Sequence, residues 1–212
     1  MLSWIRMETK HSASLREQQE RNNISNSAIP LQGVDFYHPH GIGTSPQTIC
    51  LGYEHYIGVA QGLRTDLNTK SKENGQKSIY SVLTGAKERD YSWGEQFYFS
   101  NVGILGLGLY ECEIDLWWLL IHRSGLYYSN YQGIQRILRN NIVYYDIVDD
   151  IPESDDEKEQ LRQRKLQQQV NKHILLQGEH VVIHKYSRKE FDGSYEAAYL
   201  QMLDDIERNG IE

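Results

Sequence analysis

Residues 101–123, NVGILGLGLYECEIDLWWLLIHR, contain the pattern that decides the fold class. The segment from Val102 to Leu109 is short, uncharged and interrupted by glycines, which indicates a buried strand. Acidic residues follow where a helix is expected to begin, and carboxylates suit the unpaired N–H groups of a helix N-terminus. The next run, from Leu116 to Ile121, has no polar side chain. We therefore expect a helix buried on most of its circumference.

The chain after this segment continues to alternate between strand and helix patterns. Residues 142–148 (IVYYDIV) and 179–186 (EHVVIHKY) have strand character, and residues 153–176 and 194–208 have helical spacing. In the helix at 153–176, we expect one apolar face from Leu161, Leu166, Val170 and Ile174, with the charged residues on a solvated face. A β-α-β-α-β-α order predicts an α/β fold with a Rossmann-like, mostly parallel sheet and helices on both faces.

The first part of the chain is less regular. Residues 1–30 are mostly polar, and we expect a poorly ordered lead-in before a single domain at 31–212. Residues 34–38 (VDFYH) predict the first core strand, and residues 53–63 predict an amphipathic helix. Residues 78–89 also allow a helix, and the aromatic segment 91–99 leads to the central strand.

Composition excludes several classes of function. The chain has 212 residues and a net charge of −7, which disfavours nucleic acid as a partner because phosphate binding requires a basic face. Its two cysteines, Cys50 and Cys112, form no zinc or disulfide pattern, which fits a reducing cytoplasm. The longest apolar run is far shorter than the ~20 residues of a membrane-spanning helix. We therefore expect a cytoplasmic protein that binds neither membrane nor nucleic acid.

The sequence Tyr37-His38-Pro39-His40-Gly41 is a candidate catalytic motif. It follows a predicted strand, and open α/β sheets bind ligands outside the carboxyl ends of their strands. Histidine is also suited to proton transfer near pH 7. Alternatively, both histidines only end the strand. His38 and His40 have no nearby third ligand, so we expect no metal site.

Gly103, Gly106 and Gly108 have the order G-x-x-G-x-G, which is not the dinucleotide fingerprint. The acidic residues that follow would repel a pyrophosphate at the helix start. Carboxylates there, such as Glu111 and Asp115, are instead suited to accept hydrogen bonds from ribose hydroxyls. The alternative is structural: the glycines permit close packing and the acids cap the helix.

Two segments resemble the bacterial sirtuin-like domains linked to anti-phage defence. The first is FYHPHGIGTSPQTICLGYEHY at residues 36–56, which is similar to that family's strand ending in His-Gly. The second is VGILGLGLYECEIDLWWLLIHR at residues 102–123, which is similar to its later core strand and helix. The two segments occur in the family's order, and the resemblance extends from residue 34 to the end of the chain.

This resemblance implies an NAD-binding fold and NAD glycohydrolase-type activity. His40 would match the active-site base of the His-Gly motif, acting near the ribose when the nicotinamide bond breaks. Gly41 belongs to the same motif, and Gly106 and Gly108 would match the turn near the nucleotide. Glu111 or Asp115 would contact the bound NAD.

The chain departs from this family in two ways. The family's glycine-rich phosphate loop would precede residue 34, where this chain is polar and has no G-x-G. The four-cysteine zinc module of the deacetylases cannot be built from two cysteines, so we expect no zinc and no deacetylation. We expect a truncated domain, incomplete relative to the full sirtuin-like fold and weakly active or inactive alone. The alternative is a non-catalytic module that associates with itself or with a complementary or full-length partner.

Overall fold

The computed structural model describes residues 4–8, 29–31, 34–37, 53–68, 79–86, 88, 93–110, 113–129 and 131–211. The described strands form one mixed sheet with the order β2-β3-β1-β4-β5-β6. These strands are β1 (Trp4–Glu8), β2 (Ile29–Leu31), β3 (Val34–Tyr37), β4 (Val102–Leu105), β5 (Ile142–Val148) and β6 (Val181–Ser187). The helices are α2 (Tyr53–Asn68), α3 (Ile79–Leu83), α4 (Trp93–Phe99), α5 (Ile114–Tyr128), α6 (Asp156–Gly178) and α7 (Tyr195–Asn209), with 3-10 turns η2 (Tyr131–Arg136) and η3 (Arg188–Phe191).

The predicted alternation from residue 102 onward is confirmed as β4-α5-β5-α6-β6-α7. Strands β4, β5 and β6 are parallel neighbours, with Ile104 opposite Tyr144 and Tyr144 opposite Ile183. The prediction of a mostly parallel sheet is wrong for the described strands. Strand β1 pairs antiparallel with both β3 and β4, and β2 pairs antiparallel with β3.

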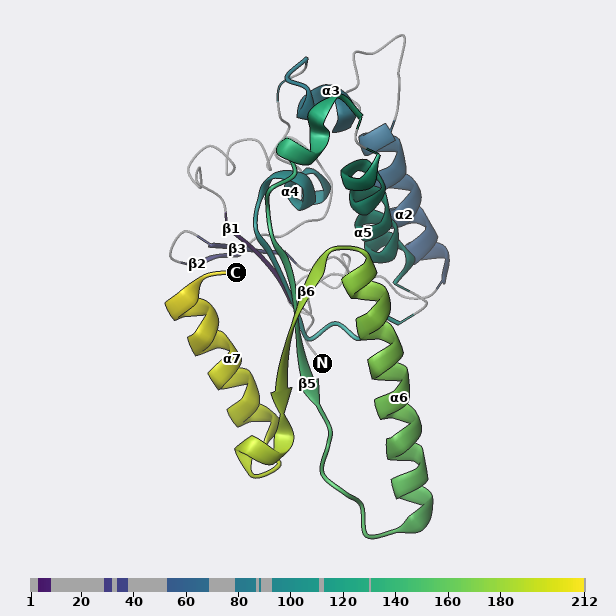
Figure 1. Cartoon of the computed structure of the whole chain (residues 1–212), viewed down its shortest axis with the longest axis vertical. Helices are drawn as coiled ribbons and strands as arrows, with labels where there is room; N and C mark the ends of the chain where they lie inside the picture. The colour runs from purple at the N-terminus through teal and green to yellow at the C-terminus, as the bar shows by residue number, and fades with distance from the viewer. Residues whose placement is uncertain are drawn as a thin grey trace.

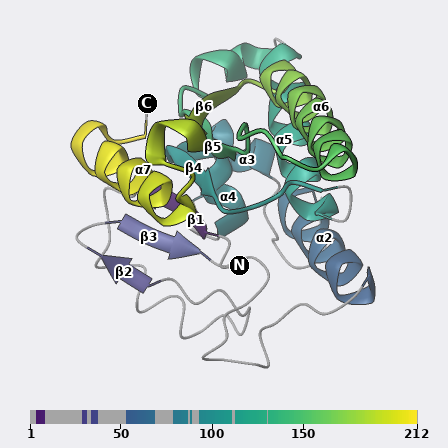
Figure 2. The same cartoon turned by 90° about the horizontal axis from the view of Figure 1, so that it is seen from below.

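Helices cover both faces of the parallel part of the sheet (Figure 1), where α5 and α6 lie on one face and α7 on the other. Because strand side chains alternate between faces, neighbouring strand residues belong to different cores. Ile104, Ile142 and Tyr144 pack with α5 and with Leu176 of α6. Leu105, Val143 and Tyr145 pack with α7. Viewed from below (Figure 2), β3 and β2 continue the sheet on the side away from α6.

The structure refines three expectations about individual elements. The central strand ends at Leu105 rather than Leu109, because Gly106 adopts a positive φ of 65° and the chain turns there. Helix α5 is buried on most of its circumference, as predicted, and exposes one narrow stripe: Ile121 is 53% exposed, whereas Leu119 is fully buried. The stretch 1–30, expected to be a lead-in, contributes β1 to the interior of the sheet order.

Helix α6 also presents an unexpected face to the sheet. Leu161, Val170 and Ile174, predicted as its apolar face, are exposed. The buried residues of this helix are instead His173 and Leu176. A polar side chain in the interface between helix and sheet requires a polar partner, and that partner lies on β5.

Candidate functional site

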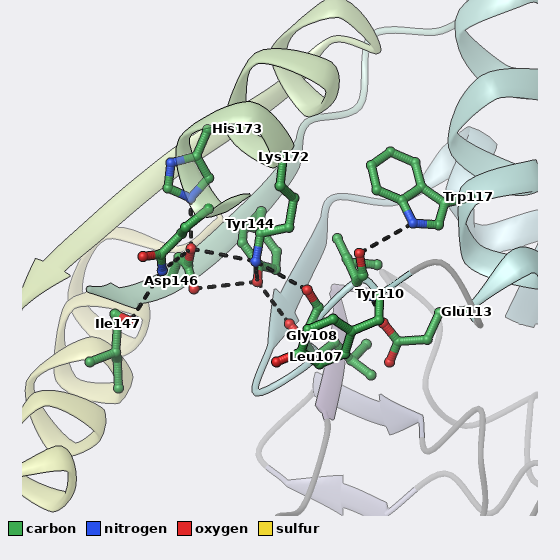
Figure 3. Close-up of polar contacts among 12 residues, drawn as sticks. Leu107, Gly108, Tyr110, Glu113, Trp117, Tyr144, Asp146, Ile147, Lys172 and His173 are labelled. Carbon is green, nitrogen blue, oxygen red and sulfur yellow. Dashed lines mark hydrogen bonds and ion pairs between the residues drawn. The ribbon is translucent and has the colours of Figure 1, made fainter. Parts of the chain in front are cut away.

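The carboxyl ends of β4 and β5 hold a cluster of polar side chains (Figure 3). Asp146 lies near the end of β5, on the same strand face as Ile142 and Tyr144, and therefore points toward α6. Three α6 residues contact this carboxylate. His173 Nε2 is 2.6 Å from Asp146 Oδ2, Gln169 Nε2 donates to the same oxygen at 2.7 Å, and Lys172 Nζ is 3.7 Å away.

Tyr144 and Lys172 connect this cluster to the turn after β4. The Tyr144 hydroxyl donates to Leu107 O at 2.8 Å and accepts from Lys172 Nζ at 2.8 Å. Lys172 Nζ also donates to Gly108 O at 3.0 Å. Its ammonium therefore lies between a buried carboxylate and a backbone carbonyl, so that the charges of Asp146 and Lys172 offset one another.

Residues 107–110 are held by side chains at every position. The carbonyls of Leu107 and Gly108 accept from Tyr144 and Lys172, and Leu109 O accepts from Trp117 Nε1 at 3.3 Å. The Tyr110 N–H donates to Glu113 Oε2 at 2.8 Å. Leu109 has a φ of 48°, a conformation that costs free energy for a residue with a side chain. Four bonds, from β5, α6, α5 and the N-cap residue of α5, thus fix a strained turn at the carboxyl edge of the sheet.

Burial shifts the pKa values of these side chains. Desolvation lowers the pKa of Lys172, and the nearby carboxylate of Asp146 opposes that shift only in part. Desolvation also lowers the pKa of His173 against the opposing hydrogen bond to Asp146. His173 is therefore a neutral imidazole at pH 7 whose Nε2–H donates to Asp146, while its buried Nδ1 has no hydrogen-bond partner among the residues that the structure describes. Burial and Asp146 raise the pKa of Tyr144, which keeps its proton.

The sequence-predicted site residues fall into two groups. Gly108 lies in the strained turn and Gly106 directly precedes it, at the edge expected for a ligand. Asp115 lies in the first turn of α5 and is fully buried. His40, Gly41 and Glu111 lie outside the described residues. Their roles stay predictions.

Sequence reasoning missed Asp146, Lys172 and His173. The charge pattern predicts that the charged residues of α6 face solvent. In the structure, however, Lys172 and His173 point toward the sheet. The available signal was Asp146 itself, an acid within the apolar strand IVYYDIV. A carboxylate in such a strand needs partners on whatever packs against it.

Comparison with known proteins identifies no relative. No family model, curated protein or solved structure matches this chain. Within the described residues, no three His, Cys, Asp or Glu side chains lie close enough together to hold a metal ion. No helix in the described part of the chain combines the length and hydropathy needed to cross a bilayer.

Proposed function

We propose that this chain is a sirtuin-like, NAD-related protein that holds the nucleotide at the carboxyl edge of β4 and β5. The observation that carries this proposal is the turn at residues 107–110, which is strained at Leu109 and bonded by three elements. Strain of this kind is concentrated at ligand sites, where surrounding structure holds a backbone in place before the ligand arrives. The order β4-α5-β5 also places this turn where α/β sheets bind ligands.

Each residue has a distinct role in this proposal. His40 is the base near the ribose, as the family resemblance implies, and acts when the nicotinamide glycosidic bond is cleaved. Gly106 and Gly108 shape the turn, and Lys172 and Tyr144 position it by binding its carbonyls. Asp146 and His173 position Lys172 and have no direct contact with the nucleotide.

The test is to measure NAD binding and nicotinamide release with the purified chain. Binding by calorimetry and nicotinamide by chromatography are both expected, with a slow release rate because residues 1–33 contain no G-x-G phosphate loop. His40→Ala is expected to abolish release and retain binding, whereas His38→Ala, in the same motif, is the matched control and should keep both. A chain that neither binds NAD nor releases nicotinamide contradicts the proposal.

A second candidate function is a non-catalytic interaction module, and the surface of α6 favours it. Val170 and Ile174 lie one helical turn apart and are both exposed, with Ile174 at 61%. Strand β6 has one described neighbour, β5, so its other edge is the end of the described sheet. An exposed apolar strip and a sheet edge without a described neighbour are each suited to bind a second protein chain.

Light scattering of the purified chain tests this second function. Self-association is expected, and Ile174→Glu should shift the population toward monomer, whereas Gln177→Glu, an exposed change on the same helix, should not. The interaction-module proposal is contradicted if the wild-type chain is a monodisperse monomer and also binds no added full-length sirtuin-like domain.

A further inference from the structure

Arg123 is a buried cation that the proposed nucleotide site does not use. It lies on α5 facing the segment before β5, and only 3% of its surface is exposed. Its Nη2 donates to Asn140 O at 2.6 Å and to Asn140 Oδ1 at 3.1 Å. Nε and Nη1, which carry three further N–H donors, are buried and have no hydrogen-bond partner within the described part of the chain.

The charge of Arg123 is not balanced by any described carboxylate. The ion pairs among the described residues involve other cations. The ionisable groups that act on it are the phenol side chains of Tyr98 and Tyr127 rather than carboxylates. Arginine does not lose its proton in proteins, so Arg123 keeps its positive charge although it is buried.

Two structural features offset this charge only in part. Asn140 is bound to the end of α4, since its Nδ2 donates to Phe97 O and Ser100 O. The negative end of that helix therefore lies near Arg123, but α4 has only two turns and a helix dipole acts over a short distance. The Asn140 carbonyls satisfy Nη2 alone, which leaves two of the three guanidinium nitrogens unsatisfied.

We propose that Arg123 anchors a binding site for a small oxyanion of the phosphate or carboxylate class. Such an anion would supply both the missing charge and the acceptors for Nε and Nη1. The site lies one layer beneath the surface, because Asn140 contacts Arg123 directly and is itself half-buried between exposed Arg139 and Asn141. It is at the amino end of β5, whereas the proposed nucleotide site is at the carboxyl end, so the two sites are distinct.

The experiment is thermal unfolding of the full chain at pH 7 and constant ionic strength. Phosphate or acetate replaces chloride in separate titrations, which distinguishes the two classes of anion. At least one of them is expected to raise the midpoint saturably, by about 5 °C or more at a hundredfold excess over its dissociation constant. Isothermal titration of the same anion into the folded protein should give a single saturable site.

Variants assign the effect to Arg123. Arg123→Met retains the apolar stem, and Arg123→Gln retains a donor for Asn140; both should lose the anion-dependent rise. In chloride, Arg123→Met should be at least as stable as wild type because the unpaired charge is gone. Arg139→Met, a nearby exposed arginine, should keep the full rise. A flat wild-type midpoint in both anions, or a rise that persists in either Arg123 variant, overturns the proposal.

Discussion

At the scale of single residues, Asp146 determines how α6 meets the sheet. A carboxylate in an apolar strand costs several kcal/mol unless it is paired, and His173, Gln169 and Lys172 all bind it. Neither the pairing nor the buried side of α6 could be predicted from helical spacing, because the helix buries its polar partners and exposes Ile174. The need for a partner could be predicted from Asp146 alone.

Replacing Lys172 tests whether this network stabilises the fold. Lys172→Met leaves Asp146 buried without its cation and frees the carbonyl of Gly108, so we expect a loss of about 2–3 kcal/mol in the free energy of unfolding. Lys165→Met, two turns earlier on the same helix and exposed, should change it by less than about 0.5 kcal/mol. Urea denaturation measures both. Equal effects of the two variants would mean that the network contributes no stability.

The protonation of His173 predicts how stability depends on pH. Because its folded pKa is lowered below the ordinary 6.5, the unfolded chain binds more protons between these two pKa values. The contribution of neutral His173 to the free energy of unfolding is therefore fully present above about pH 6.5. It is lost as the pH falls through the folded pKa. Lys172 and Lys185 act in the same direction as burial, and Asp146 opposes them.

Urea midpoints at pH 7.5 and pH 5.0 measure this dependence. The wild-type chain should be less stable at pH 5.0, and His173→Gln should reduce the difference, since an amide can still donate to Asp146 without titrating. Burial also lowers the pKa of His122, so His122 accounts for part of the pH dependence that remains in this variant. His184→Gln, at an exposed position of β6, is the control. If the difference between the two urea midpoints is the same in His173→Gln as in wild type, His173 is not the residue responsible.

At the scale of elements, the period of the apolar residues predicted which segments are helices and strands. Strand β5 matches its predicted bounds, and α2 contains the helix predicted at 53–63. Helices α6 and α7 overlap the helices predicted at 153–176 and 194–208 but begin one to three residues later. The orientation of α5 was predicted less well, because its run of apolar residues gives no contrast between faces. Packing against the sheet selects Leu116, Leu119 and Leu120, and leaves Ile121 toward solvent.

A pair of substitutions on α5 tests this orientation. Leu119→Ala removes a fully buried side chain and should cost about 2–4 kcal/mol through lost burial and a residual cavity. Ile121→Ala, two residues along the same helix, should cost about 1 kcal/mol or less because half of that side chain is already in water. Urea denaturation of both variants gives the comparison. Similar costs would indicate that α5 is buried on both sides.

At the scale of the whole molecule, the sequence predicted the β4-to-α7 half and missed how the sheet continues beyond β4. Residues 4–8 (WIRME) are too short and too mixed in character to stand out beside a long polar stretch. Their strand conformation depends on β3 and β4, which local patterns do not report. For the same reason, the carboxyl-edge turn could be anticipated from its glycines, whereas its bonds to α6 could not.

The place of β1 between β3 and β4 also has a consequence for the order of folding. Ile5 pairs with Ile104, about a hundred residues later, whereas β4 pairs with β5 and β5 with β6, in each case the next strand along the chain. Closing so long a loop is slow compared with local pairing. In pulse-labelled hydrogen exchange during refolding, amides of β5 should become protected before those of β1. On the ribosome, β1 is made before β4 and would nevertheless be among the last of the described strands to join the sheet, and until then the edge of β4 needs shielding from other chains.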